Sequence, residues 1–238
     1  MVSQPRLAIG SYQPQADNRA VVWGLLALLE RSSLQVQHFF SQACFCLFDG
    51  AKAATGLSSR HLDSWLMSPE LCREVFLHAG EGCDLRVVEG TYCPATTAGR
   101  GGRLDVVSDW LQLPRLAIVD VKRATGCGLP PRPTTADALI LDGVRDGVDL
   151  CYWQTLLEPL WGKPVVGAID TADAARAEIA ALPLGTSPSP ELCQELARRL
   201  GALTCVDRLQ KLAHREPLAA AEAQLFRTGT GLDRVRVA

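Results

Sequence analysis

The residues from Arg6 to Arg31 have the order of a buried strand, a short loop and an amphipathic helix, which is where an α/β protein can hold phosphate groups. A phosphate-binding loop needs glycines whose backbone N–H groups converge, a lysine for the phosphates and a serine or threonine for Mg²⁺. Here no glycine lies between Gly10 and Gly24, and Pro14 lacks an N–H donor. The segment therefore predicts the frame of a nucleotide site without its usual chemistry.

Four polar residues of this loop stand where a phosphate would lie: Ser11, Asp17, Asn18 and Arg19. Near a protein surface, two like charges ~4 Å apart cost about 4 kcal/mol before screening, roughly a thousandfold in affinity. Asp17 would impose that cost on a phosphate. We favour a loop that does not bind nucleotide. The alternative is an altered nucleotide site in which Arg19 or Lys122 supplies the positive charge.

Two further stretches could bind a ligand. Glu89 ends a predicted strand and could either coordinate a metal ion or accept hydrogen bonds from neighbouring loops, with Asp120 as the other acid nearby. The polar segment from Ala53 to Trp65 carries Arg60 and Asp63, which suits a flat, partly apolar ligand with carboxylates. The alternative for this segment is a packing role in which its arginine and aspartate pair with each other.

The remaining reactive side chains predict no catalytic site. The histidines are scattered, and Ser58 and Ser59 lie in no nucleophile motif, so we expect surface or packing roles for them. Nine cysteines are most simply small buried hydrophobes in a reducing compartment. Cys44 and Cys46 stand one residue too close for a usual zinc pair. The histidines are His38, His61, His78 and His214.

Composition indicates one α/β domain of 238 residues with 47% hydrophobic and 21% charged residues. The net charge of −2 and the absence of a basic run argue against a nucleic-acid partner. No apolar run approaches the ~18 residues of a membrane span, and residues 1–9 do not resemble a signal peptide. We expect a cytoplasmic protein without a membrane partner.

Strands alternate with helices along the chain, which predicts a doubly wound, mostly parallel sheet with helices on both faces. Residues 41–64 are expected to be irregular, residues 1–214 to form the domain, and residues 215–238 to be a loose tail. The loops after Ile9, Phe40, Val88, Val121 and Leu141 should surround one crevice. The predicted strands are Arg6–Ile9, Leu34–Phe40, Asp84–Val88, Arg115–Val121, Ala138–Leu141 and Val165–Ile169. The predicted helices are Asn18–Arg31, Pro69 to about Gly80, Arg103–Leu111, Leu150–Leu160, Glu191–Leu200 and Val206–Ala213.

Two motifs, ATGLSSRHLDSWLMSPE from Ala54 and CDLRVVEG from Cys83, resemble the N-terminal synthetase domain of cobyrinate a,c-diamide synthases. The resemblance implies the P-loop NTPase fold of the dethiobiotin synthetase group and an ATP-dependent amidoligase of cobalamin biosynthesis. It also implies that the first motif faces a tetrapyrrole. Glu89 is the acidic residue of the second motif, at the end of its strand. The ligand-binding residues carried over from the first motif are Thr55, Gly56, Ser59, Arg60, Asp63 and Trp65.

The departures from this family bear on its ATP chemistry. The family's phosphate-loop lysine and threonine fall on Asn18 and Arg19, and its adenine-reading asparagine falls on Asp142. An acidic segment of the family falls on residues 40–47, where its lysine and both aspartates are missing. We therefore expect no cofactor, with Mg·ATP bound only if the site has been rebuilt, and no confident catalytic residue.

The final residues LDRVRVA resemble the first strand of the family's glutaminase domain, which makes 215–238 resemble a linker to a missing domain. Three functions follow. The favoured one is a catalytically degenerate homologue that binds a protein partner or a carboxylated, corrinoid-like ligand. The others are an active ATP-dependent amidoligase with a separate glutaminase subunit, and an inert fragment of a split gene. We also expect a homodimer that covers the face left by the absent domain.

Overall fold

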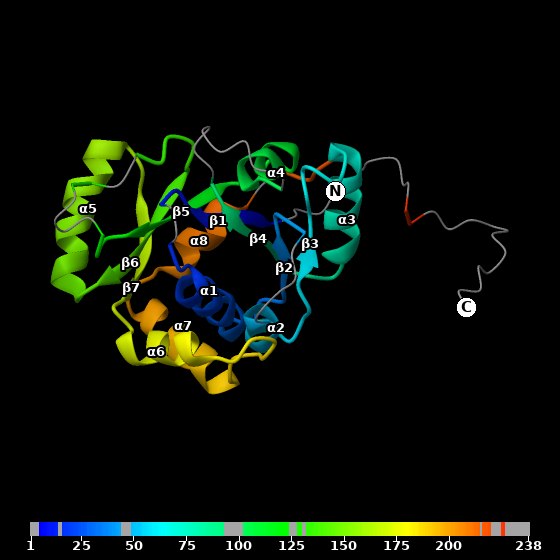
Figure 1. Ribbon diagram of the computed structural model, residues 1–238. Helices are drawn as coiled ribbons and strands as arrows, with labels where there is room; N and C mark the ends of the chain where they lie inside the picture. The colour runs from blue at the N-terminus through cyan, green and yellow to red at the C-terminus, as the bar shows by residue number, and fades with distance from the viewer. Residues whose placement is uncertain are drawn as a thin grey trace, which may run out of the picture.

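A computed structural model describes residues 5–13, 16–43, 49–92, 102–123, 128–129, 132–214, 216–219 and 225–226. Seven strands form one sheet in the order β3-β2-β4-β1-β5-β6-β7, and every strand pair is parallel. This arrangement confirms the predicted doubly wound α/β fold (Figure 1). The strands are β1 (Arg6–Ser11), β2 (Val36–Phe40), β3 (Arg60–His61), β4 (Leu85–Thr91), β5 (Arg115–Asp120), β6 (Ala138–Val144) and β7 (Val165–Asp170).

Helices cover both faces of the sheet (Figure 1). One face is packed by α1, α2, α6, α7 and α8, and the other by α3 and α4 at one end and α5 at the other. The helices are α1 (Arg19–Arg31), α2 (Gly50–Thr55), α3 (Pro69–Ala79), α4 (Leu104–Trp110), α5 (Gly147–Trp161), α6 (Asp173–Ala181), α7 (Pro190–Ala202) and α8 (Val206–Ala213).

The helix α1 is the centre of the larger hydrophobic core, because all its residues from Ala20 to Leu29 are buried. A helix that is apolar on every side must be covered on every side. The second layer is supplied by α7, which lies so close that a Cβ on Gly24 would be 3.1 Å from the carbonyl oxygen of Leu196. The packing fixes the start of α1 at the carboxyl end of β1.

The helix α3 begins as its sequence predicts. The side chain of Ser68 accepts the backbone N–H of Leu71 at 3.2 Å, and Pro69 occupies the first turn, where its missing N–H costs nothing. Its end at Ala79 lies one residue from the expected boundary. Local capping chemistry was sufficient to define this element.

Three elements were not predicted. Residues 41–64 were expected to be irregular, but they contain α2 and the short strand β3. The side chain of Asp49 caps α2 by accepting the N–H of Lys52, and Ala51 and Ala54 bury its inner face. The helix α6 was also missed, because only Ala175 and Ile179 are buried along it. Both helices are too short or too weakly apolar to give a periodic signal.

The described parts of the expected loose tail are packed against the domain. Leu218 is buried beneath α3 and α4, and the Arg6 guanidinium donates to the carbonyl oxygen of Glu216 at 2.8 Å. Further along, Glu74 of α3 accepts the backbone N–H groups of Leu225 and Phe226, both at 2.9 Å. These contacts contradict a loose tail at the residues concerned.

In the described part of the chain, no helix is long and apolar enough to cross a membrane.

Candidate functional site

A small pocket of about 180 Å³ lies where β1, β2 and β4 end and α1 begins. This position agrees with the predicted crevice for the loops after Phe40 and Val88. Its walls require glycine, because a Cβ on Gly90 would lie 2.0 Å from the hydroxyl oxygen of Ser41. The lining residues are Asn18, Phe40, Ser41, Gln42, Glu89, Gly90, Thr91 and Gly102.

Glu89 lies in this pocket and is held from behind by a buried histidine. The His38 ring is fully buried, and its Nε2 lies 3.1 Å from Oε2 of Glu89. The other ring nitrogen, Nδ1, lies 2.9 Å from the hydroxyl oxygen of Ser59. With Nε2 donating to the carboxylate, Nδ1 can accept from the hydroxyl, so both ring nitrogens are satisfied. This chain fixes the orientation of Glu89 and leaves its second oxygen for the pocket.

His38 was expected to have a surface or packing role, and Ser59 lies in no nucleophile motif. The packing role is correct, since the ring is enclosed, but the hydrogen-bond chain to Glu89 was missed. These residues are far apart in sequence and meet because β2 pairs with both β3 and β4. Only the strand order brings them together.

The carboxylate of Asp17 lies at the start of α1 and is bound there. The Asp17 carboxylate accepts the backbone N–H of Arg19 at 3.1 Å, and the Arg19 guanidinium donates to both carboxylate oxygens at 2.9 and 2.7 Å. Burial alone would raise the pKa of Asp17, but the bonds from Arg19 outweigh it and hold that pKa below its ordinary value. A carboxylate therefore occupies the N-terminal end of the helix, which is the position that attracts phosphates.

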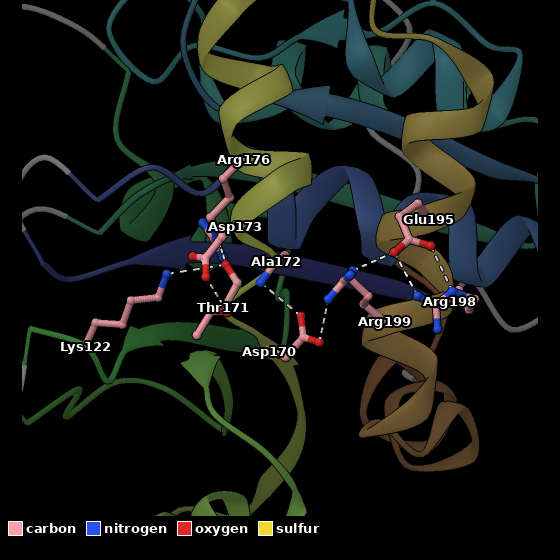
Figure 2. Close-up of polar contacts among 9 residues, drawn as sticks. All are labelled: Lys122, Asp170, Thr171, Ala172, Asp173, Arg176, Glu195, Arg198 and Arg199. Carbon is pink, nitrogen blue, oxygen red and sulfur yellow. Dashed lines mark hydrogen bonds and ion pairs between the residues drawn. The ribbon is translucent and has the colours of Figure 1, made fainter.

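The other phosphate-loop candidates are also engaged. The hydroxyl oxygen of Ser11 accepts the N–H of Gln13, whose side-chain amide exchanges two hydrogen bonds with the backbone of Asp120. Asn18 borders the pocket, and its side-chain oxygen is buried without a hydrogen-bond partner in the described part of the chain. Lys122, the second proposed cation, donates to the carbonyl oxygen of Thr171 at 3.4 Å (Figure 2).

A separate polar cluster closes the carboxyl ends of β6 and β7. Arg176 donates to the carbonyl oxygen of Thr171 at 2.8 Å and forms an ion pair with Asp142. Burial raises the pKa of Asp142 to about 6, against the opposing effect of this arginine. The residue at the family's adenine position is therefore a carboxylate already bound to the protein.

The same cluster continues along α7 in Figure 2. Arg199 donates to Asp170 at 2.7 Å and to Glu195 at 2.6 Å, while Arg198 donates to both carboxylate oxygens of Glu195. Glu195 faces two guanidinium groups, which lower its pKa to about 2. The paired charges hold α6 and α7 against the end of β7.

The residues of the first family motif do not form one site. Thr55 borders a different hollow with Leu34 and Gln35, at the end of the sheet where β2 begins. The adjoining Gly56 ends α2 with a φ of +74°, a backbone role that suits glycine. Ser59 bonds His38 midway along β2. The motif therefore extends along β2, and only its later residues approach the Glu89 pocket.

Asp63 and Arg60 do not pair. Asp63 is buried and accepts the N–H groups of Ala43, Trp65 and Leu66. This structural role replaces the expected pairing of Asp63 with Arg60. The Arg60 side chain is exposed and has no ion-pair partner among the described residues, and the Trp65 residue is 62% exposed. These two residues remain available to a ligand on the surface.

Metal-binding groups do not converge in the described part of the chain, where no three His, Cys, Asp or Glu side chains could hold one ion. Cys44, Cys46 and the second half of the family's acidic segment, residues 44–47, lie outside the described residues. Burial raises the pKa of the Cys72 and Cys193 thiols to about 11, as expected for small hydrophobic residues. Cys151 and Cys205 are exposed, so the prediction of burial was wrong for them.

No family model matches the chain. Among solved structures it is similar to the 54 kDa signal recognition particle protein of Aeropyrum pernix with GDP, at 13% identity and a TM-score of 0.49, covering 89% of this chain and 48% of that one. It is also similar to the septum site-determining protein MinD of Pyrococcus horikoshii with Mg-ADP, at 12% identity and a TM-score of 0.46, covering 88% and 94%.

Several curated relatives share one name. The hydrogenobyrinate a,c-diamide synthase of Streptomyces coelicolor is 33% identical over 119 residues, 49% of this chain and 24% of that protein. The cobyrinate a,c-diamide synthases of Archaeoglobus fulgidus and Picrophilus torridus are 25% and 22% identical, over 86% and 98% of this chain. The chain spans 43% and 56% of their lengths. These similarities confirm the resemblance to cobyrinate a,c-diamide synthases that the two sequence motifs indicate.

Proposed function

We propose that this chain is a catalytically degenerate member of its family that acts by binding a ligand or partner. The observation that carries the proposal is the Asp17 carboxylate bound to the N–H and guanidinium of Arg19. A nucleotide phosphate entering at α1 would have to displace that carboxylate or lie beside it. Either route costs binding free energy. Two like unit charges ~4 Å apart near a surface repel by roughly 4 kcal/mol before screening, and the exposure of Asp17 and its pairing with Arg19 reduce that figure.

The acidic groups around the pocket support the same proposal. Mg²⁺ binds through carboxylates together with substrate phosphates and keeps an octahedral shell. Within the described lining, Glu89 is the one carboxylate, and His38 occupies one of its oxygens. Activation of a carboxylate by phosphoryl transfer needs phosphate ligands and metal ligands together. Glu89 supplies at most one of these.

The ligand that we propose is a flat, partly apolar molecule with carboxylates, of the corrinoid kind. Arg60 offers an exposed guanidinium, and Trp65 and Leu66 are 62% and 59% exposed nearby in the sequence. Arginine can bind a carboxylate through two parallel hydrogen bonds, while an indole ring packs on a flat apolar surface. Asp63 holds the turn that carries Trp65.

Calorimetric titration with Mg·ATP tests the degenerate site. The natural chain is compared with a variant that carries Asp17→Gly, Asn18→Lys and Arg19→Thr, which restores the family's loop chemistry. We expect no binding heat from the natural chain. Micromolar binding of Mg·ATP to the natural chain would overturn the proposal in favour of an active amidoligase that works with a separate glutaminase.

Equilibrium dialysis with a corrinoid that bears free carboxylates tests the ligand class. We expect Arg60→Gln to weaken binding about tenfold or more, since it removes a charge-assisted pair. Arg198→Gln is the matched control, because it removes the same charge from α7. Equal effects of the two substitutions would show a general charge effect and contradict an Arg60 site.

A further inference from the structure

The Glu89 pocket has the chemistry of a cation site rather than an anion site. Its described lining contains one carboxylate, amide and hydroxyl groups, and no arginine, lysine or histidine. Side-chain burial of Glu89 is substantial, with 17% of the side chain exposed. A partly desolvated carboxylate attracts a positive hydrogen-bond donor more strongly than it would in water.

Two oxygen atoms in this pocket lack donors. Glu89 uses Oε2 to bind His38, which leaves Oε1 without a donor in the described chain. The side-chain oxygen of Asn18 is buried and has no hydrogen-bond partner among the described residues. A buried acceptor without a donor destabilises the folded chain, so a ligand that supplies an N–H group to the Asn18 oxygen would remove that penalty.

The neighbouring positive groups do not cancel this preference. The Arg19 guanidinium is bound to Asp17 through two hydrogen bonds, and the Arg103 guanidinium binds Asp105 in the same way. The N-terminal N–H of α1 already donates to Asp17. Among the described residues at the pocket, the carboxylate of Glu89 is therefore the charge that no guanidinium pairs with.

The size of the pocket limits the ligand. A volume of about 180 Å³ holds about six water molecules at roughly 30 Å³ each. Ammonium, or a primary amine with about six non-hydrogen atoms, would fit inside the pocket. A whole nucleotide or tetrapyrrole would extend beyond it.

We propose that this pocket binds the ammonium group of a small primary amine, with Oε1 of Glu89 and the side-chain oxygen of Asn18 as acceptors. His38 is a positioning residue, since it holds the other oxygen of Glu89 away from the ligand. Gly90 lets the β4 backbone approach Ser41 and shapes the wall. The proposal does not depend on the corrinoid-like ligand proposed for Arg60 and Trp65.

The test follows backbone and side-chain amides of the ¹⁵N-labelled full chain by NMR during titration with methylammonium chloride, with ionic strength held constant by potassium chloride. We expect saturable shifts at Gly90, Thr91 and the side-chain amide of Asn18. Glu89→Gln should weaken binding about tenfold or more, and Asn18→Asp should strengthen it. Glu195→Gln, which removes an equal charge from α7, should leave binding unchanged.

Three comparisons can overturn the proposal. Tetramethylammonium carries the same charge without N–H donors, so equal shifts with this ion would contradict recognition by hydrogen bonds. Saturation of the same amides by Mg²⁺ at lower concentrations would identify a metal site instead. Unchanged methylammonium affinity in both Glu89→Gln and the isosteric Asn18→Leu would exclude these acceptors, and the second variant covers the case in which the first does not fold.

Discussion

Asp17 and Arg19 form a closed pair at the first turn of α1, in which one carboxylate accepts both a backbone N–H and a bidentate guanidinium. The pair satisfies one N–H group of the helix start and places a negative charge where an external anion would bind. Its effect on function can be measured because asparagine at position 17 keeps a side-chain oxygen that can accept the same N–H. The charge can therefore be removed while that acceptor is kept.

We expect Asp17→Asn to raise the affinity for tripolyphosphate by about tenfold or more, because it removes one like charge and releases the Arg19 guanidinium. Calorimetry in the absence of metal measures this gain. Glu195→Gln, which frees guanidinium groups on α7, serves as the control. An equal gain in both variants would show that net charge, not the α1 end, controls the binding.

Asp142 should make stability depend on pH in an unusual direction. Its pKa is about 6 in the folded chain against an ordinary 3.8. Between these values the folded chain holds a proton that the unfolded chain has lost, so stability falls as pH rises from about 4 to 6. Asp142→Asn removes this loss. As pH rises, the free energy of unfolding of the variant should therefore increase relative to that of the natural chain by about 3 kcal/mol at most, at about 1.4 kcal/mol per pKa unit.

Urea unfolding of the natural chain and Asp142→Asn at pH 4 and pH 7.5 measures that gain. The difference between the two proteins should shift in favour of the variant at the higher pH. The ion pair with Arg176 exists only where Asp142 is ionised, and its effect is already contained in the folded pKa, so it does not change the direction of the shift. A difference that stays constant with pH would contradict the raised pKa of Asp142.

Close approach of β1 and β4 should make Gly10 intolerant of a side chain. A Cβ there would lie 2.3 Å from the carbonyl oxygen of Gly90, which is backbone and cannot rotate away. We expect Gly10→Ala to destabilise the fold by about 3 kcal/mol. Gly147→Ala is the control, since no atom lies within 4 Å of its Cβ position at the start of α5, and it should cost nothing. Similar thermal shifts for both would rule out the steric explanation.

The sequence was sufficient for elements whose signals are local. The strand and helix within Arg6–Arg31 were predicted because a short apolar run typical of a buried strand is followed by apolar residues at helical spacing. The helix α3 was predicted because Ser68 and Pro69 mark its start. The sequence also predicted that Asp17 places a negative charge where a phosphate would bind. It did not predict that Arg19 pairs with Asp17, since a bidentate bond to a residue two positions away depends on side-chain rotamers.

Contacts between strands could not be predicted. His38, Ser59 and Glu89 meet because β2 lies between β3 and β4 in the sheet, and no spacing in the chain encodes that order. The same limit separated Thr55 from the pocket, because one motif extends along a whole strand. The family resemblance named the motif residues from Thr55 to Trp65 as one set. The fold instead places Thr55 where β2 begins and Asp63 beyond the end of β2.

Docking of the described tail should contribute to stability through Leu218. This residue is 7% exposed and packs with α3 and α4, whereas Leu225 is 59% exposed although its backbone N–H binds Glu74. We expect Leu218→Ala to lower the free energy of unfolding by about 2–3 kcal/mol, the cost of a core cavity, and Leu225→Ala to change it by less than about 0.5 kcal/mol. Urea unfolding measures the free energy of unfolding of both variants, which lose the same side-chain atoms at a buried and at an exposed position. If Leu218→Ala were as mild as its control, the tail would lie outside the cooperative unit, and the bond from Arg6 to the carbonyl oxygen of Glu216 would not couple it to the sheet.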